Sequence, residues 1–353
     1  MSGILLYCRA GFEKECAREI QEHARVTNLA GYANAKEGSG FVLFNAYDEA
    51  TSEIRFAELM FARQLIVGAT LLERLPITDR IAPLLERARM LAPHYSAIWL
   101  ETADTSEAKE LSTFTRKLAV PLNRVAREGG LLTHDDGNAP RLHLFFVSAT
   151  AALVGISHPG NSSPWLMGIP RLKFPRDAPS RSTLKLDEAF LTFLRCPEEA
   201  LCPGMTAVDL GAAPGGWTWQ LVHRHIKVIA VDNGQLQADL LESGLVQHLR
   251  ADAFRYRPTK PVDWMVCDVV EQPARIAALV ARWVGDGWCR RSIFNLKLPM
   301  KKRFDEVQQC REIIAEALTK AGVAYLLLFK QLYHDREEVT GFLQHMDSRR
   351  RAG

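Results

Sequence analysis

The stretch VDLGAAPGGW, residues 208–217, carries three glycines where a strand should give way to a helix. A turn of this kind lets the backbone approach a ligand closely. Dinucleotide-binding turns follow the spacing G-x-G-x-x-G, and Gly211, Gly215 and Gly216 lack its middle glycine. Pro214 also removes an amide donor, and no G-K-[ST] of a phosphate-binding loop follows. The turn therefore predicts a ligand that presents little phosphate.

Acidic residues follow the same series of expected strands. Asp232 closes the strand after the turn, where a carboxylate can accept hydrogen bonds from both hydroxyls of a ribose. Asp252 follows the next strand, in a position to meet an adenine amino group, and Asp209 and Asp268 lie in two others. These acids would attract a cation and repel a pyrophosphate. Ribose, adenine, a sulfonium cation and no phosphate together predict S-adenosyl-L-methionine as the cofactor.

Strands and helices alternate around this turn throughout the C-terminal half. Apolar runs predict strands at 206–211, 227–232, 246–252, 263–269, 291–298, 324–332 and 339–345. Helical spacing predicts helices at 183–194, 215–225, 273–284 and 304–321. This order indicates an α/β fold with a doubly wound, mostly parallel, Rossmann-like sheet. Its ligand should lie beyond the C-terminal ends of the strands.

The N-terminal half predicts two smaller sets of elements. A strand at 4–10, a helix at 12–24 and a strand at 40–46 indicate a compact α/β part. An α+β module with no visible catalytic cluster follows. We predict for it a strand at 65–72, a helix at 81–91, a strand at 97–103, a helix at 106–127 and a hairpin over 141–157.

The segment GIPRLKFPRDAPSRSTLKL, residues 168–186, interrupts this pattern with three prolines. Its only acid is Asp177, which is opposed by Arg171, Lys173, Arg176, Arg181 and Lys185. A solvated connector would have this composition. A strap that contacts phosphates would have it too, because cations on a proline-stiffened loop lose less freedom when they bind a polyanion. The composition alone leaves both interpretations open.

Composition limits the class of protein. A chain of 353 residues that is 47% hydrophobic and 24% charged is typical of a soluble protein with two or three domains. No apolar run is long enough to span a membrane and no signal peptide is evident, so we expect a cytoplasmic protein. Seven scattered cysteines without a CxxC argue against disulfides and a metal site. The net charge of +3 comes from a mildly basic C-terminal half, which suits an acidic partner.

The motif VDLGAAPGGW closely resembles the first motif of the FtsJ/RrmJ-type RNA ribose 2′-O-methyltransferases. That family uses a Lys-Asp-Lys-Glu tetrad, which the resemblance assigns to Lys185 in STLKLDEAF, Asp268 in MVCDVV, Lys297 in FNLKLP and Glu338 in REEVT. The same resemblance implies a set of cofactor contacts in and around the turn. They are Ser182, Gly211, Ala213, Pro214, Gly215, Gly216, Trp217, Asp232, Asp252 and Asp268.

Longer stretches, among them LCRAGFEKECAREI, WMVCDVVEQPARIAALVARW and QLYHDREEVT, are similar to a bacterial family that methylates large-subunit ribosomal RNA. The likeness covers almost the whole chain. It implies a ferredoxin-like part at 1–55, a THUMP RNA-binding domain at 56–165, a basic linker at 166–182 and the methyltransferase domain at 183–353. The implied target is a cytidine ribose of 23S rRNA, as naked or early-assembly RNA. We expect a monomer.

The chemistry of a ribose 2′-hydroxyl explains why such a tetrad would be needed. The hydroxyl is a weak acid, so a base must take its proton as the new bond forms. Lys297 is the best base. Desolvation, the Lys185 ammonium and the sulfonium should disfavour the charged form of Lys297. Asp268 should instead favour the charged form of Lys297 and hold its side chain in place. Glu338 should pair with Lys185.

Several cations are expected to meet RNA phosphates: Arg171, Lys173, Arg176, Arg181, Lys301, Lys302 and Arg303. Cys267 should face the core, which argues against a cysteine-dependent base methylation. One alternative is a 2′-O-methyltransferase for another RNA, such as tRNA. Another is a non-catalytic RNA-binding ribosome assembly factor. A nicotinamide oxidoreductase is disfavoured by the glycine spacing.

Overall fold

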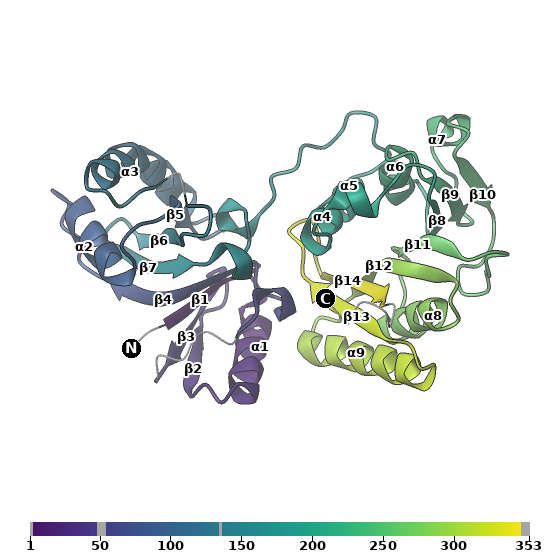
Figure 1. The fold of residues 1–353 in the computed structure, drawn as a ribbon, viewed down its shortest axis with the longest axis horizontal. Helices are drawn as coiled ribbons and strands as arrows, with labels where there is room; N and C mark the ends of the chain where they lie inside the picture. The colour runs from purple at the N-terminus through teal and green to yellow at the C-terminus, as the bar shows by residue number, and fades with distance from the viewer. Residues whose placement is uncertain (1–2, 48–53, 134–135, 347–353) are drawn as a thin grey trace. The chain divides into compact units, whose positions relative to one another are not determined.

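The computed structural model describes residues 3–47, 54–133 and 136–346. The chain divides into two compact units, Met1–Pro170 and Arg171–Gly353 (Figure 1). Each unit is built around its own seven-stranded sheet.

One mixed sheet organises the N-terminal unit, with strand order β2-β3-β1-β4-β7-β6-β5. Strand β4 hydrogen-bonds to β1 on one side and to β7 on the other, so the two predicted N-terminal parts share a single sheet. The elements run as β1 (Gly3–Tyr7), α1 (Glu13–Val26), β2 (Gly31–Ala35), β3 (Phe41–Ala46), β4 (Gln64–Leu72), α2 (Ile81–Leu91), β5 (Ala97–Thr102), α3 (Lys109–Glu128), β6 (Arg141–Ser148) and β7 (Ala151–Ser157), with short 3₁₀ turns at Phe56–Glu58, Pro159–Asn161 and Leu166–Gly168.

The helices of this unit pack on their sheet through apolar faces. Helix α1 contacts β2 and β3, α2 contacts β7, and α3 contacts β5 and β6. The predicted helices and the 141–157 hairpin are confirmed to within a few residues. Strand β2 was not predicted, because its sequence GYANA has no alternation of large apolar and polar residues. It forms at the edge of the sheet by pairing with β3.

The C-terminal unit has the strand order β10-β9-β8-β11-β12-β14-β13. Strands β8 to β12 pair in parallel, and β14 pairs antiparallel with both β12 and β13. This confirms the doubly wound, mostly parallel sheet. Its elements are α4 (Thr183–Phe193), α5 (Pro197–Ala200), β8 (Thr206–Leu210), α6 (Gly216–Val222), β9 (Lys227–Val231), α7 (Ala238–Glu242), β10 (Val246–Leu249), β11 (Val262–Cys267), α8 (Pro273–Gly285), β12 (Cys289–Lys297), α9 (Arg303–Lys320), β13 (Tyr325–Lys330) and β14 (Glu338–His345).

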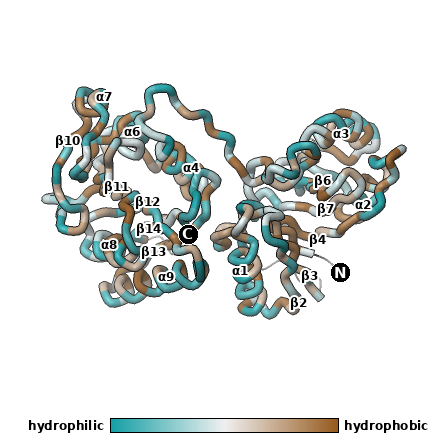
Figure 2. The backbone as a smooth tube through the Cα atoms, turned by 180° about the vertical axis from the view of Figure 1, so that it is seen from behind, coloured by the Kyte–Doolittle hydropathy of each residue, from teal (hydrophilic) through white to brown (hydrophobic). Residues whose placement is uncertain are grey.

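Helices cover both faces of this second sheet (Figure 1). Helices α4 and α6 pack together on one face. On the other face, α8 packs against both strand β12 and helix α9. Along the backbone, α9 alternates hydrophilic and hydrophobic residues, as expected of a helix with one buried face (Figure 2).

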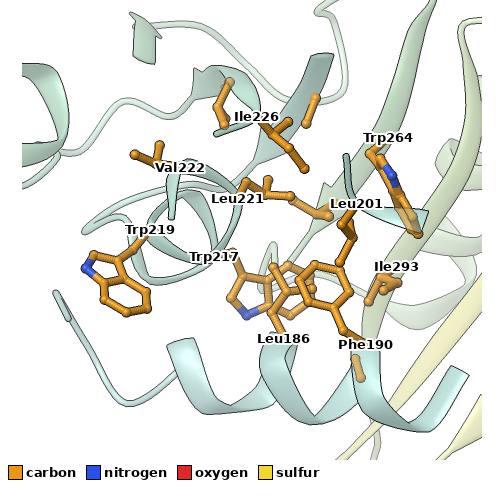
Figure 3. Close-up of a cluster of buried hydrophobic side chains, with 14 of the residues drawn as sticks. Leu186, Phe190, Leu201, Trp217, Trp219, Leu221, Val222, Ile226, Trp264 and Ile293 are labelled. Atoms are coloured by element: carbon orange, nitrogen blue, oxygen red, sulfur yellow. The ribbon is translucent and has the colours of Figure 1, made fainter. Parts of the chain in front are cut away.

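The core between α4, α6 and the sheet determines where α4 lies. Leu186 and Phe190 are one turn apart on α4 and lie beside Trp217 of α6, with Trp264 and Ile293 from the sheet nearby (Figure 3). Leu186 and Phe190 are fully buried. Burying a side chain of this size contributes about 1.5–3 kcal/mol. The packing therefore fixes the position of Lys185, the residue before Leu186.

Candidate active site

Four residues of the predicted tetrad lie together at the carboxyl edge of the second sheet. Lys297 is the last residue of β12 and pairs directly across from Glu338, the first residue of the antiparallel β14. Asp268 follows β11, the parallel neighbour of β12. Lys185 reaches the same place from the first turn of α4. Residues far apart in the chain are thus brought to one point by strand register and helix packing.

The tetrad forms a closed set of ion pairs. Lys297 Nζ lies 2.7 Å from Asp268 Oδ1 and 3.0 Å from Glu338 Oε1. Lys185 Nζ lies 2.5 Å from Glu338 Oε2 and 3.9 Å from Asp268 Oδ2. The side chains are 14–22% exposed, so a substrate can reach them while bulk water is largely excluded. Glu338 contacts both lysines, although the sequence had suggested a contact with Lys185 alone.

The second carboxylate changes the expected charge of Lys297. Desolvation lowers the pKa of Lys297, but the carboxylates of Asp268 and Glu338 outweigh it and raise the pKa above its ordinary value. The expectation that the charged form is disfavoured therefore does not hold for the protein alone. The reason is geometric, because Lys297 meets two carboxylates where the sequence suggested one.

Register also separates two adjacent glutamates. Glu337 lies outside β14 and pairs with Arg303, with its Oε2 2.6 Å from an Arg303 nitrogen. Arg303, predicted to contact RNA, is therefore engaged inside the protein, and its side chain is only 14% exposed. Lys301 and Lys302, predicted with it, are both exposed.

The glycine turn leaves no room for side chains. A Cβ atom on Gly211 would lie 2.7 Å from a Val269 methyl, and one on Gly215 would lie 2.3 Å from Leu240. Gly211 and Gly215 also have positive φ angles of 79° and 115°. On Gly216 a Cβ would meet Ser182 Oγ at 2.3 Å. The backbone of the turn is thus held tightly against its neighbours, as a close approach to a ligand requires.

Ser182 stands beside this turn at the start of α4. Its hydroxyl makes no helix-capping hydrogen bond and lies 2.7 Å from that of Ser180. Its carbonyl accepts a hydrogen bond from the Trp217 indole at 3.1 Å. The Trp217 ring is buried in the core, so any contact of Trp217 with the cofactor would involve its backbone (Figure 3).

The predicted ribose and adenine acids flank the turn. Asp232 follows β9, and its carboxylate accepts the backbone N–H of Ala213 at 3.0 Å and that of Gly234 at 2.7 Å. It therefore anchors the turn residues Ala213 and Pro214 to the end of β9. Asp252 lies in the loop beyond β10, where its carboxylate is half exposed and accepts the Phe254 N–H at 2.7 Å.

Asp209 is a buried acid directly beneath the turn. Its Oδ2 accepts the Thr218 hydroxyl at 2.6 Å, whereas its buried Oδ1 has no hydrogen-bond partner among the described residues. Burial raises the pKa of Asp209 to about 7, and the nearby charges of Asp268 and Asp232 act in the same direction, while the hydrogen bond from Thr218 acts against them. A glycine cradle surrounded by acids fits a cationic cofactor without phosphate, which agrees with S-adenosyl-L-methionine.

We predict that Asp209→Asn removes part of the pH dependence of stability. The carboxyl pKa is raised from 3.8 to about 7 on folding, so its stabilising contribution is present at low pH and is lost as pH rises to 7. Between pH 5 and pH 8 the wild type should therefore lose about 2–3 kcal/mol more unfolding free energy than the variant. Denaturant unfolding of both cofactor-free proteins at the two pH values measures this difference. Equal losses would contradict the assignment.

The linker cations lie in a segment without helix or strand. Residues 171–182 form only turns and bends. The predicted phosphate contacts in this segment are all exposed: Arg171, Lys173, Arg176 and Arg181. Asp177, its single acid, lies 3.4 Å from His223 Nε2.

The described residues contain neither a cluster of metal-binding side chains nor a membrane-spanning helix. Within residues 3–47, 54–133 and 136–346, no group of three or more His, Cys, Asp or Glu side chains could hold a metal ion. In the same ranges, none of the helices is long and apolar enough to cross a membrane. Cys267 is fully buried, and burial raises its thiol pKa to about 12, which leaves it unsuited to act as a nucleophile.

Sequence reasoning missed Asn295, which lies next to the tetrad. Its amide contacts both Asp268 and Glu338, at 3.0 and 3.2 Å. The available signal was strand alternation, since Asn295 is two residues before Lys297 in the apolar run IFNLKL and must share its face.

The fold and the site define an FtsJ-like methyltransferase. The family model described as FtsJ-like methyltransferase matches residues 178–338, which include the glycine turn and all four tetrad residues. Members of this class take their methyl group from S-adenosyl-L-methionine, which is the cofactor here. Upstream, the RlmM ferredoxin-like domain matches residues 1–66, and the N-terminal model of ribosomal RNA large subunit methyltransferase M matches residues 79–158.

The chain belongs to the ribosomal RNA large subunit methyltransferase M family. It is 58% identical to the protein of that name from Methylococcus capsulatus, over 97% of this chain and 98% of the relative. Its identity to the Stutzerimonas stutzeri protein is 52%, over 98% of this chain and 100% of the relative. Among solved structures it is similar to TrmN from Thermus thermophilus, with 13% identity, a TM-score of 0.36 and coverage of 98% and 100%. A similarity this low supports no conclusion by itself.

Proposed function

We propose that this protein methylates the 2′-hydroxyl of a cytidine ribose in 23S rRNA. The observation that carries the proposal is the Lys185–Asp268–Lys297–Glu338 cluster beside the glycine turn. Two lysines held by two carboxylates can accept a proton and orient an oxygen, which is what a hydroxyl nucleophile needs. The names of its relatives, which refer to the large-subunit RNA, support the choice of substrate.

The proposed reaction is an in-line displacement in which Lys297 takes the proton. S-adenosyl-L-methionine, when bound, would supply the methyl group from a positive sulfonium, whose sulfur would leave as a neutral thioether as its bond to the methyl carbon breaks. In the neutral form, Lys297 Nζ accepts the 2′-hydroxyl proton as the oxygen attacks the methyl carbon. Asp268 and Glu338 then stabilise the ammonium that forms, which agrees with the raised pKa of Lys297. Lys185, held by Glu338, orients the 2′-oxygen.

Lys297 must lose its proton before it can act as a base in the complex with cofactor and RNA. Because the two carboxylates favour the ammonium in the protein alone, substrate binding must shift the balance toward the neutral amine. A sulfonium nearby and the exclusion of water by RNA both act in that direction. Transfer should therefore accelerate as pH rises toward the pKa of Lys297 in the complex.

The remaining parts of the chain would select and hold the RNA. We propose that the N-terminal unit contains the THUMP RNA-binding domain. Exposed cations of the linker and of the segment after β12 would contact phosphates: Arg171, Lys173, Arg176, Arg181, Lys301 and Lys302. Naked or early-assembly RNA in the cytoplasm is the proposed substrate, and a monomer the acting form.

Labelling the product tests this proposal directly. Purified protein would be incubated with methyl-labelled S-adenosyl-L-methionine and unmodified 23S rRNA, 16S rRNA or a tRNA pool, followed by digestion to nucleosides. We expect label in 2′-O-methylcytidine from 23S rRNA alone. Label in a methylated base would contradict the tetrad mechanism, and label in tRNA would favour the alternative RNA.

A negative result has a defined follow-up. If no RNA is labelled although the cofactor binds, the assay is repeated on ribosomal particles isolated from cells that lack the protein. Label in these particles would identify an assembly intermediate as the substrate. No label there would favour a non-catalytic assembly factor.

A further inference from the structure

A second pair of residues lies on the same sheet face as the tetrad, one step deeper. Asn295 and Lys297 are two residues apart on β12, as are Glu338 and Thr340 on β14. Asn295 pairs across from Thr340, just as Lys297 pairs across from Glu338. Alternation along a strand puts all four side chains on one face. Asn295 and Thr340 are fully buried, so they support the cluster from inside.

The orientation of the Asn295 amide follows from its neighbours. Its Nδ2 lies 3.0 Å from Asp268 Oδ1 and 3.2 Å from Glu338 Oε2. Carboxylates only accept hydrogen bonds when ionised, so the NH₂ group must point toward them. The amide oxygen then accepts the Thr340 hydroxyl at 2.7 Å. One amide thus donates to both carboxylates that hold Lys297.

The hydrogen bonds continue from Thr340 to Asp335. Thr340 has a single proton, which it donates to Asn295, yet its oxygen also lies 3.0 Å from Asp335 Oδ2. Asp335 Oδ2 also accepts the backbone N–H of Leu332 at 3.0 Å. Asp335 is 1% exposed, and burial raises its pKa well above the ordinary value. The hydrogen-bonded set therefore extends from the two carboxylates through Asn295 and Thr340 to the buried Asp335.

We propose that Asn295, oriented by Thr340, is the residue that positions Asp268 and Glu338 around the base Lys297. This inference rests on the proposed function, in which Lys297 takes a proton. The amide holds two like-charged carboxylates at one place and shares their charge through hydrogen bonds. Without it, the two carboxylates would lose these hydrogen bonds, and their unshared charge would stabilise the Lys297 ammonium more strongly. The amine would then become neutral less readily.

The test compares Asn295→Ala and Asn295→Asp with a matched pair at Thr340. Thr340→Val removes the hydroxyl at constant shape, and Thr340→Ser keeps it. Full-length proteins would be assayed for single-turnover transfer to 23S rRNA across pH, with cofactor affinity measured by calorimetry. Asn295→Ala should lower the rate about 10- to 100-fold at neutral pH, because a misplacement of about 1 Å around a reacting group can cost about 100-fold. Asn295→Asp should move the rising limb of the pH profile to higher pH.

The Thr340 pair separates a positioning role from a packing role. Thr340→Val should reduce the rate and Thr340→Ser should restore it, with cofactor affinity unchanged in both. Equal rates for Val and Ser, or a wild-type rate for Asn295→Ala, would overturn the inference. If the Asn295 variants fail to fold, the comparison of Thr340→Val with Thr340→Ser still distinguishes a positioning role from a packing role.

A substrate-independent measurement keeps this inference separate from the proposed function. The pKa of Lys297 can be followed in cofactor-free protein by amine-reactive labelling and mass spectrometry at a series of pH values. We expect a higher pKa in Asn295→Ala than in the wild type, and an unchanged or lower value would overturn the inference. A wild type that transfers no methyl group to ribose contradicts the proposed function, whichever way Lys297 titrates.

Discussion

Replacing Lys297 by alanine should reduce methyl transfer by about 10²- to 10⁴-fold, the usual contribution of a general base. The substitution removes the only amine that contacts both Asp268 and Glu338 at 3.0 Å or less among the described residues. Affinity for S-adenosyl-L-methionine should stay within a few-fold, because the ion pairs of Lys297 are with Asp268 and Glu338 and hold the tetrad. Single-turnover kinetics and calorimetry measure the two quantities.

The control for this variant is Lys301→Ala. Lys301 is a lysine in the same segment, but it is exposed and lies outside the cluster. Its loss should weaken RNA binding in a salt-dependent way without changing the rate on the bound complex. Wild-type turnover by Lys297→Ala would exclude Lys297 as the base.

Replacing Glu101 by alanine should lower the stability of the N-terminal unit by about 3–5 kcal/mol, as expected when one partner of a buried charged network is removed. Glu101 is 1% exposed, and its two oxygens accept hydrogen bonds from Tyr7 Oη at 2.6 Å, His143 Nδ1 at 2.7 Å and the Met167 amide at 2.7 Å. Two buried donors and the half-buried Met167 amide would lose their acceptor together. Calorimetry should show the transition of this unit lowered by roughly 10 °C.

The hydrogen bonds of this network follow the same order as the catalytic triad of a serine hydrolase. His143 Nε2 lies 2.8 Å from Ser157 Oγ, which completes a Ser–His–Glu series. All three residues are at most 1% exposed, so no substrate can reach the serine and the network holds the sheet together. Glu107→Ala, at an exposed position nearby, should change stability by less than about 0.5 kcal/mol. A similarly small effect at Glu101 would contradict this role.

Local patterns predicted most of the second sheet because its strands are apolar runs separated by clear helices. The bounds of α4, α8 and α9 differ from the predicted ranges by a residue or so. Strand β2 was missed because an edge strand can form by pairing alone, without an apolar pattern of its own. Short elements such as α5 and α7 escaped for a related reason, since four or five residues carry little periodicity.

By itself, the sequence determined the methyltransferase class and the cofactor turn, because these depend on residue types at set distances from strand ends, which a chain displays directly. The four tetrad positions were predicted from the resemblance to the FtsJ-type family, with Glu337 and Glu338 adjacent in the sequence. Only the tertiary structure decided that Glu338 faces the lysines while Glu337 pairs with Arg303, because this choice follows from the β12–β14 register. It also brought two carboxylates to Lys297, which raise its pKa, and it brought the Asn295 amide against both carboxylates. A pKa and a hydrogen-bond direction depend on neighbours that are distant in sequence, and folding alone brings those neighbours together.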